Sequence, residues 1–152
     1  MTKLVTKEGL QKLKEELEDR KTRVRQSIAR DIKEAKEQGD LSENAEYSEA
    51  KRQQAENEAR VAKLEGMIKN SQVVEKNGNS NGCVEISSDV EVNFNGNKIT
   101  FHIVGASEAD PTNFKISNES PIGKAFLGKK KGDTAKVETP GGIVKYKILK
   151  VA

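Results

Sequence analysis

The sequence predicts an α+β protein of two domains. An antiparallel α-helical coiled-coil hairpin is expected over residues 1–76, and a smaller domain with an antiparallel sheet and one short helix over residues 77–152. Three observations lead to this class. All three prolines and nine of the twelve glycines lie after residue 77. Apolar residues recur at helical spacing in the first half and alternate with polar residues in the second. A polar stretch rich in glycine and asparagine, KNGNSNG, separates the halves.

The first half carries the pattern of two amphipathic helices. The first apolar stripe comprises Leu10, Leu13, Leu17, Val24, Ile28, Ile32 and Ala35. The second is rich in alanine and comprises Ala45, Ala55, Ala59, Ala62, Leu64, Met67 and Ile68. Small side chains there would let the second helix pack closely against the first. Because the connection is short, the two helices must run antiparallel, as in a two-stranded coiled coil.

Residues 37–47, EQGDLSENAEY, form the predicted bend, with Gly39 where the first helix ends. From residue 37 to residue 50 there is no Lys or Arg, and the acids are Glu37, Asp40, Glu43, Glu46 and Glu49. We call residues 37–47 the acidic tip. Asp40 and Glu43 have the spacing of a capping box, with Asp40 as the N-cap of the second helix. Capping accounts for one or two of these acids. The others repel one another at a spacing of three, which suggests compensation from outside the chain.

The second half carries two hairpin patterns and one helix start. Residues 90–94 and 99–103 alternate around the turn Asn95-Gly96. Ser120-Pro121 is typical of an N-cap followed by proline at the first helical position. Thr134 to Thr139 and Ile143 to Val151 form the second predicted hairpin, around Pro140-Gly141-Gly142.

Composition excludes several classes. One cysteine, Cys83, and one histidine, His102, allow neither a structural zinc site nor a Ser/His/Asp triad. Without an apolar run of about 18 residues or the apolar stretch of a signal peptide, we expect a soluble cytoplasmic protein with no membrane contact. A basic cluster lies between Arg20 and Arg30. Whether it meets RNA, protein or only water stays open.

Several motifs resemble one known family. The nonapeptide GDLSENAEY, preceded by EAKEQ and followed by SEAKRQQ, is similar to the tip signature of the bacterial transcript cleavage factors of the GreA/GreB family. The likeness covers almost the whole chain, through KEGLQKLKEEL, SQVVE, HIVGASEAD, SNESPIGKAFLGKKKGD and VETPGGIVKYKILKV. The TPGG motif is more similar to the GreA branch than to the GreB branch.

The resemblance implies an elongation factor that is not itself an enzyme. Such a factor binds bacterial RNA polymerase as a monomer, inserts its coiled coil through the secondary channel, and stimulates the polymerase's own cleavage of RNA in backtracked complexes. Asp40 and Glu43 would hold a second Mg²⁺ jointly with the polymerase and position the attacking water, with Glu46 as a supporting acid. Two carboxylates on a solvated tip bind Mg²⁺ weakly, so the isolated protein is expected to hold no cofactor stably.

The resemblance also suggests how the remaining parts act. Lys36 and Lys51 are candidates to pair with phosphates of the nascent RNA 3′ end. The second domain would have an FKBP-like fold and dock on the channel rim, with Ser120 and Pro121 as candidate contacts. Two alternatives remain. One is a channel-binding inhibitor of the same fold without cleavage activity. The other is a prolyl isomerase or interaction module whose hairpin serves for dimerisation.

Overall fold

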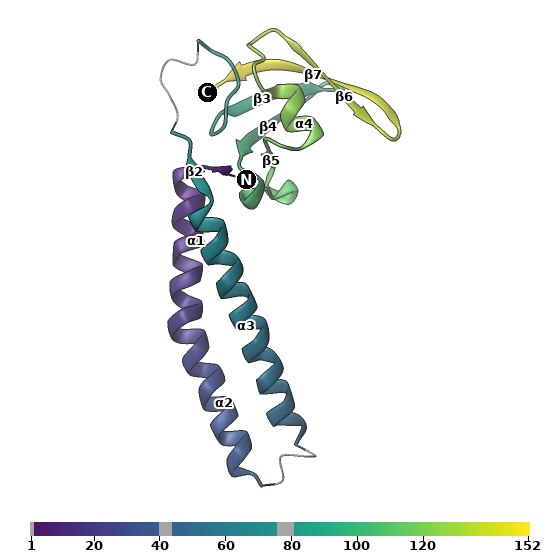
Figure 1. Ribbon diagram of the computed structural model, residues 1–152. Coiled ribbons are helices and arrows are strands. Elements are labelled where there is room, and N and C mark those ends of the chain that lie inside the picture. Colours follow the sequence, from purple (N-terminus) through teal and green to yellow (C-terminus); the bar gives the residue numbers. More distant parts are fainter. Residues whose placement is uncertain (1, 40–43, 76–80) are drawn as a thin grey trace. The chain divides into compact units, whose positions relative to one another are not determined.

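The computed structural model describes residues 2–39, 44–75 and 81–152 and confirms the α+β class (Figure 1). Its helices are α1 Lys7–Asp19, α2 Arg25–Glu37, α3 Ala45–Lys69 and α4 Pro121–Phe126, with a π-helical turn Arg20–Val24 joining α1 to α2 and 3₁₀ turns at Ala106–Glu108 and Pro111–Asn113. Its strands are β1 Lys3–Val5, β2 Ser71–Val73, β3 Asp89–Phe94, β4 Asn97–Val104, β5 Lys115–Ser117, β6 Thr134–Thr139 and β7 Gly142–Val151. No helix in the described ranges is long and apolar enough to cross a membrane.

The chain forms two compact units whose boundaries differ from those expected. One unit is Gln11–Asn70, and the other combines Met1–Leu10 with Ser71–Ala152. The sequence predicted a single division at residue 76, because the N-terminal strand carries no signal of its pairing. β1 lies parallel to β2, with Lys3 opposite Ser71 and Val5 opposite Val73. This pairing joins the first residues to the second half of the chain.

The start of α1 is anchored by a carboxylate from a distant part of the same unit. The backbone amide of Thr6 donates to Oε2 of Glu108 over 2.8 Å, and the Thr6 hydroxyl contacts the other carboxylate oxygen. The Thr6 Oγ1 atom in turn accepts a hydrogen bond from the amide of Gly9. A Cβ atom at Gly9 would lie 2.0 Å from the Glu108 carboxyl carbon, so a larger residue at that position would displace this carboxylate from its contacts with Thr6.

The hairpin unit buries the predicted stripe of its first helix. Leu13, Ile28 and Ala35 are all less than 9% exposed. Hydrogen bonds and ion pairs join Glu16 to Arg60 and Arg25 to Glu58, so residue numbers rise along one helix as they fall along the other. The helices are therefore antiparallel, as predicted (Figure 1).

The predicted stripe of the second helix is confirmed at Leu64, Met67 and Ile68, which are buried or half-buried, but it is wrong at its alanines. The alanines at positions 45, 55, 59 and 62 are exposed. The face of α3 that is buried or half-buried comprises Tyr47, Ala50, Gln54, Asn57, Val61, Leu64 and Ile68. These positions alternate at steps of three and four, as in a coiled-coil seam. Two of these positions are polar, Gln54 and Asn57, so the apolar pattern of the true seam is interrupted. The more numerous alanines therefore predicted a stripe on a different face of the helix.

The second unit is built on a five-stranded sheet of order β5-β4-β3-β7-β6. Both predicted hairpins are confirmed: β3 pairs with β4 and β6 with β7, both antiparallel. Asn95 and Gly96 both have positive φ, 50° and 83°, which is the requirement of the predicted tight turn. β5 was not predicted, because three residues are too few to show alternation. It pairs parallel with β4 at one edge of the sheet.

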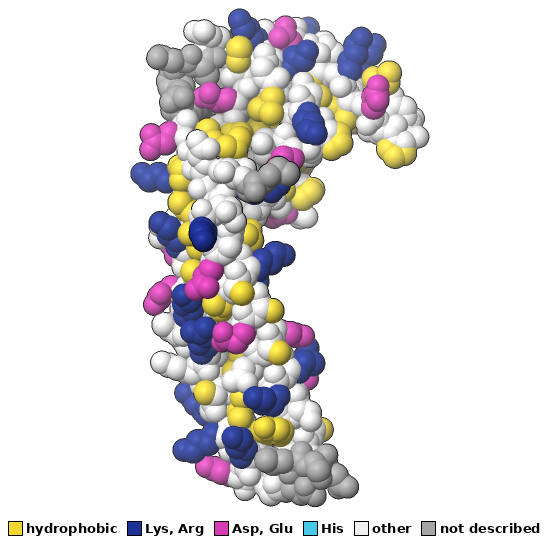
Figure 2. Space-filling view, viewed as in Figure 1, with side chains coloured by type: hydrophobic (Ala, Val, Ile, Leu, Met, Phe, Trp, Pro, Cys, Tyr) yellow, Lys and Arg dark blue, Asp and Glu magenta, His cyan; other side chains and the backbone are white. Residues whose placement is uncertain are grey.

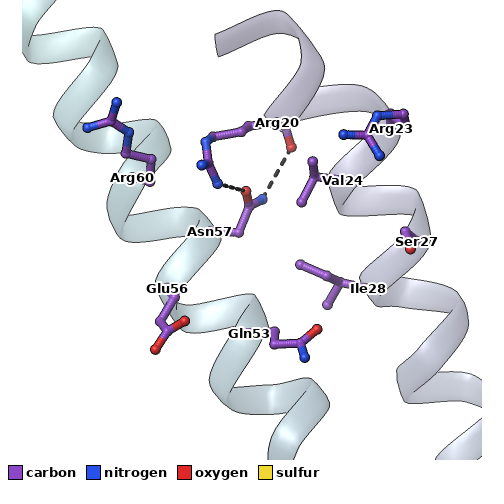
Figure 3. Close-up of a pocket in the computed structure, with 9 residues that line it drawn as sticks. All are labelled: Arg20, Arg23, Val24, Ser27, Ile28, Gln53, Glu56, Asn57 and Arg60. Carbon is purple, nitrogen blue, oxygen red and sulfur yellow. Dashed lines mark hydrogen bonds between the residues drawn. The ribbon is translucent and has the colours of Figure 1, made fainter. Parts of the chain in front are cut away.

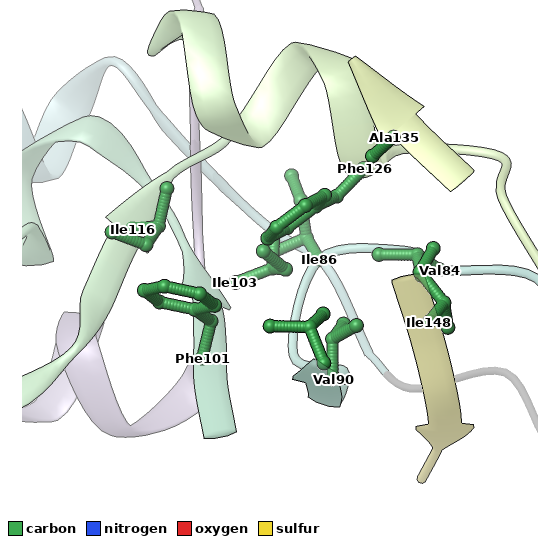
Figure 4. Close-up of a cluster of buried hydrophobic side chains, with 10 residues drawn as sticks. Val84, Ile86, Val90, Phe101, Ile103, Ile116, Phe126, Ala135 and Ile148 are labelled. Atoms are coloured by element: carbon green, nitrogen blue, oxygen red, sulfur yellow. The ribbon is translucent and has the colours of Figure 1, made fainter. Parts of the chain in front are cut away.

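Helix α4 and the sheet enclose the core of this unit (Figure 4). Phe126 is fully buried, and its ring centroid lies 5.6 Å from that of Phe101 and 5.5 Å from that of Tyr146. Phe101 and Tyr146 are themselves 5.9 Å apart in an edge-to-face arrangement. These rings pack against one another, which is typical of a filled core. A prolyl isomerase would instead require aromatic rings that line an open pocket.

Candidate functional site at the tip of the helical hairpin

Asn44 closes the bend of the hairpin. Its side-chain Nδ2 donates to the backbone carbonyl of Ala35 over 2.7 Å, and its Oδ1 accepts from the backbone amide of Tyr47 over 3.1 Å. One side chain therefore caps the first turn of α3 and also satisfies a carbonyl in the last turn of α2. The two bonds thus join the end of α2 to the start of α3.

The N-cap predicted at Asp40 is wrong, because α3 begins only at Ala45 and Asn44 is its cap. Asparagine is as good a capping residue as aspartate, so the sequence offered both candidates and the capping-box spacing selected the wrong one. Asp40 and Glu43 themselves lie outside the described residues. The predicted end of the first helix is confirmed, since α2 ends at Glu37 and Gly39 has a φ of +110°.

Removing the Asn44 side chain is expected to destabilise the hairpin. Asn44→Ala deletes the cap of α3 and the bond to Ala35 together, and we expect a loss of about 1 to 2 kcal/mol in the free energy of unfolding. Urea titration followed by helical circular dichroism measures this. Asn44→Asp keeps an acceptor for Tyr47 but has no donor for Ala35, so it should cost less. An equal loss in both variants would show that the cap contributes nothing.

The described acids near the bend differ in their partners. Glu49 receives two hydrogen bonds from the Arg52 guanidinium and one from Gln53. The bonds from Arg52 and Gln53 lower the pKa of Glu49 to about 2. Its charge is therefore compensated within the chain and not from outside, contrary to the expectation for the whole series. Glu46, in the first turn of α3, is exposed and has no hydrogen bond or ion pair with another described residue.

The two candidate RNA-binding lysines lie on either side of the bend. Lys36 is in the last turn of α2, and Lys51 is in the second turn of α3. Both are exposed. Lys51 Nζ donates to Oε1 of Gln54 over 2.9 Å, a neutral partner that leaves the positive charge uncompensated. Both side chains are therefore accessible to an anion.

The candidate docking residues belong to the other unit, at the start of α4. The Ser120 hydroxyl donates to the backbone carbonyl of Ser117 over 2.7 Å and accepts from the amide of Gly123 over 3.0 Å. The predicted N-cap is thus confirmed, with Pro121 at the first helical position. Pro121 is exposed. The serine hydroxyl serves the helix, whereas the proline ring is available to a partner.

Farther along the hairpin, a polar network crosses between the helices (Figure 3). Asn57, only 3% exposed, receives a hydrogen bond from the Arg20 guanidinium over 3.2 Å and donates to the backbone carbonyl of Arg20 over 3.2 Å. Arg20 begins the π-helical turn, where backbone carbonyls lose their usual α-helical partners. Asn57 satisfies one of them. No local pattern predicted this turn, because it depends on a partner in another helix.

Most side chains of the basic cluster between Arg20 and Arg30 are paired with acids of the hairpin. The ion pairs are Arg20 with Glu16, Lys21 with Glu65, Arg23 with Asp19, and Arg25 with Glu58. Basic and acidic side chains are interleaved along the hairpin surface (Figure 2). The positive charges of the basic cluster are therefore compensated by neighbouring carboxylates.

Glu16 is expected to make hairpin stability depend on pH. Two bonds of 2.8 Å from Arg60 and one from Arg20 lower its pKa from 4.5 to about 2. A depressed carboxyl pKa stabilises the fold above pH 4.5, and this contribution is lost as the pH falls from 4.5 toward 2. Because the side chain is 33% exposed, we expect about 1 to 2 kcal/mol, well below the full value of the shift.

The measurement compares urea unfolding at pH 7 and pH 3 for the wild type, Glu16→Gln and Glu15→Gln. Glu16→Gln should be less stable at pH 7 and should lose less on acidification. Glu15 bonds to Gln11 and not to an arginine, so Glu15→Gln should behave as the wild type does. A wild-type acid loss that persists in Glu16→Gln would assign the effect to other carboxylates.

Nearly the whole chain is similar to known proteins. Two family sequence models match it: "Transcription elongation factor, N-terminal" over residues 3–73 and "Transcription elongation factor, GreA/GreB, C-term" over residues 79–152. The chain is 51% identical over 151 residues to Transcription elongation factor GreA of Thermoanaerobacter pseudethanolicus, with 97% of this chain and 96% of that protein covered. It is 47% identical to Transcription elongation factor GreA of Acetivibrio thermocellus, with 97% and 94% covered. Among solved structures, GreA factor homolog 1 (Gfh1) of Thermus thermophilus is 28% identical over 100% of this chain and 99% of that chain, with a TM-score of 0.45.

Proposed function

This chain belongs to the GreA/GreB family of transcription elongation factors, and on that premise we propose that it stimulates cleavage of RNA by bacterial RNA polymerase in backtracked or arrested complexes. The hairpin enters the secondary channel of the polymerase, and the acidic tip reaches the polymerase active site. The polymerase performs the hydrolysis with its own catalytic centre. The factor contributes side chains and is not itself the nuclease.

The observation that supports this proposal most is the bend closed by Asn44 at the end of two paired helices. The Asn44 bonds to Ala35 and Tyr47 hold together the two sides of a short connection that contains acids and no base. Glu46, the nearest described acid after that connection, has no partner among the described residues. A slender arm of this kind delivers negative charge into a narrow space, where a wider domain would not fit.

The acids of the tip have the chemistry that a magnesium site requires. Carboxylate oxygens are the hard ligands that Mg²⁺ prefers. Asp40 and Glu43 would hold a second Mg²⁺ jointly with the polymerase, and that ion would stabilise the charge of the oxygens in phosphoryl transfer. The same carboxylates orient the attacking water by accepting its protons in hydrogen bonds. Glu46 adds negative charge beside them.

The remaining candidate residues position the two macromolecules. Lys36 and Lys51, exposed and without carboxylate partners among the described residues, pair with phosphates near the RNA 3′ end. Pro121, exposed at the start of α4, contacts the rim of the channel, and Ser120 fixes the proline by capping the helix. In this scheme the hairpin acts on the reaction and the other unit provides affinity.

Adding the protein to stalled, backtracked polymerase complexes in the presence of Mg²⁺ tests the proposal. We expect short 3′ fragments of RNA to appear faster than in complexes without the factor. Polymerase binding with no cleavage and with slower nucleotide addition would identify an inhibitor of the same fold. Absence of polymerase binding would reject the proposal altogether.

A further inference from the structure

The seam of α3 follows an unbroken repeat of seven residues. Ala50, Asn57 and Leu64 are buried and lie seven residues apart. Gln54 and Val61, between them, have the same spacing and are half-buried and buried. A helix with such a repeat stays in register with a partner helix that has the same repeat.

The facing helix departs from that repeat by one residue. Leu10, Leu17 and Val24 are half-buried and seven residues apart, but the next position of the series, Asp31, is exposed. Ile32 is half-buried in its place. Buried side chains at positions 28 and 35 likewise replace exposed ones at positions 27 and 34. One extra residue therefore separates the two halves of this seam.

The π-helical turn Arg20–Val24 takes up the extra residue. Its hydrogen bonds span five residues where those of an α-helix span four, so it holds about one residue more per turn. In a continuous α-helix, the residues after Val24 would be turned by about 100°. Ile28 and Ala35 would then leave the seam, and the Ala35 carbonyl would lose its bond from Asn44. The turn thus sets the rotation of α2 about its axis.

Side-chain packing beside the π-helical turn is incomplete. Two grooves, of about 440 Å³ and about 210 Å³, are both lined by Ile28 and Asn57. Figure 3 shows the larger one between the helices. Because these grooves leave space beside Ile28, apolar packing alone does not hold α2 at one rotation.

Hydrogen bonds of Asn57 hold the turn instead. Its Nδ2 donates to the backbone carbonyl of Arg20, and its Oδ1 accepts from the Arg20 guanidinium, both over 3.2 Å. The same guanidinium donates to Glu16, whose carboxylate also accepts two bonds from Arg60 in α3. Because Asn57 is only 3% exposed, replacing its amide by an apolar group would leave the Arg20 carbonyl without this partner, which is costly in a buried position.

We propose that Asn57 is a positioning residue for the acidic tip. Asn57 holds the π-helical turn, the turn fixes the rotation of α2, and α2 leads directly into the tip. This inference rests on the proposed function, because the tip acids matter to RNA cleavage only if that function holds. A buried asparagine in a coiled-coil seam specifies one arrangement of the helices at a cost in stability. Stability and cleavage should therefore respond differently to its replacement.

Asn57→Leu is expected to lower the cleavage rate at saturating factor by roughly tenfold to 100-fold, since small displacements of reacting groups have effects of that size. The factor concentration that gives half the maximal rate should not change, because the candidate docking residues are at the start of α4. RNA cleavage in stalled, backtracked complexes at several factor concentrations gives both values. Asn57→Asp keeps the acceptor for the Arg20 guanidinium and lacks the donor for the Arg20 carbonyl, so it should lower the rate too.

Deletion of Gln26 should rescue Asn57→Leu. Gln26 is exposed, and its removal places the seam residues on both sides of it in one continuous repeat of seven. A π-helical turn is then no longer needed. The double variant should cleave within about threefold of the wild-type rate, because the two changes act on the same element. A general loss of packing at position 57 would not be repaired in this way.

Solvent exchange of the Asn44 side-chain amide protons, measured by NMR on the full chain without polymerase, reports on the bend itself. These protons should lose protection in Asn57→Leu and regain it when Gln26 is also deleted, because the bond to Ala35 depends on the rotation of α2. Helical circular dichroism verifies that each variant is folded. This measurement tests the positioning role even if the wild-type factor stimulates no cleavage, a result that would reject only the proposed function.

Gln53→Leu is the matched control. Gln53 is a half-buried amide of α3 that lines the same groove, but its Nε2 donates to Glu49 and not to the π-helical turn. This variant should keep wild-type cleavage and wild-type protection of Asn44. Wild-type protection of Asn44 in Asn57→Leu, equal losses in Gln53→Leu, or failure of the Gln26 deletion to restore protection would each overturn the proposal.

Discussion

Replacing Asp40 or Glu43 by alanine is expected to lower stimulated RNA cleavage by at least about 100-fold while polymerase binding persists. Each substitution removes a carboxylate that would hold the second Mg²⁺ and orient water. Neither removes a contact of α4, through which the factor would dock. Because the hairpin is held by Asn44 and by the seam of α3, loss of one tip carboxylate should not unfold it.

Two measurements separate chemistry from binding. Cleavage rates come from RNA fragments released over time, and affinity comes from competition with the wild-type factor for the same complexes. Asp40→Asn and Glu43→Gln should also fail, since amides keep the shape and lose the charge. Glu34→Ala serves as the control, because Glu34 is an exposed acid of α2 that lies before the acidic tip. Wild-type cleavage by both alanine variants would contradict the assignment of these acids.

Gly123→Ala is expected to destabilise the second unit by about 3 kcal/mol or more. A Cβ atom at Gly123 would lie 1.9 Å from the backbone oxygen of Ser117 and 2.9 Å from its carbonyl carbon. That oxygen also accepts the hydrogen bond from the Ser120 hydroxyl, so it cannot move without breaking the cap of α4. The Ser120-Pro121 segment and the packing of Phe126 would both be disturbed.

Amide exchange measured by NMR shows where the effect falls. Protection should decrease in β4, β5 and α4, and polymerase binding should decrease with it, whereas α3 should keep its helicity. Gly66→Ala is the matched control, because a Cβ atom at Gly66 meets nothing within 4 Å. Within helix α3 this change should stabilise by about 0.5 to 1 kcal/mol. An unchanged unfolding transition in Gly123→Ala would show that β5 and α4 can separate at little cost.

The residue types of the candidate site could be predicted from the sequence, but the contact that closes the bend could not. The absence of bases around Glu46 is visible in the sequence, as is the break at Gly39. The closing contact is not, because the Asn44 bond to Ala35 joins residues nine positions apart. Asn44 was nevertheless detectable as a strong N-cap residue directly before Ala45. The pairing of Glu49 with Arg52 was also visible as an i, i+3 spacing on a helix.

Short-range periodicity and turn chemistry were sufficient to predict part of this fold. Two antiparallel helices with a break at Gly39, two β-hairpins, and a short helix capped by Ser120 all follow from residues within a few positions of one another. Tertiary structure alone decided which face of α3 forms the seam, because Asn57 is buried only through its bonds to Arg20 in the other helix. It also decided that β1 joins β2 and that Glu108 anchors α1. Those contacts depend on residues that folding brings together across most of the chain, and no local pattern records them.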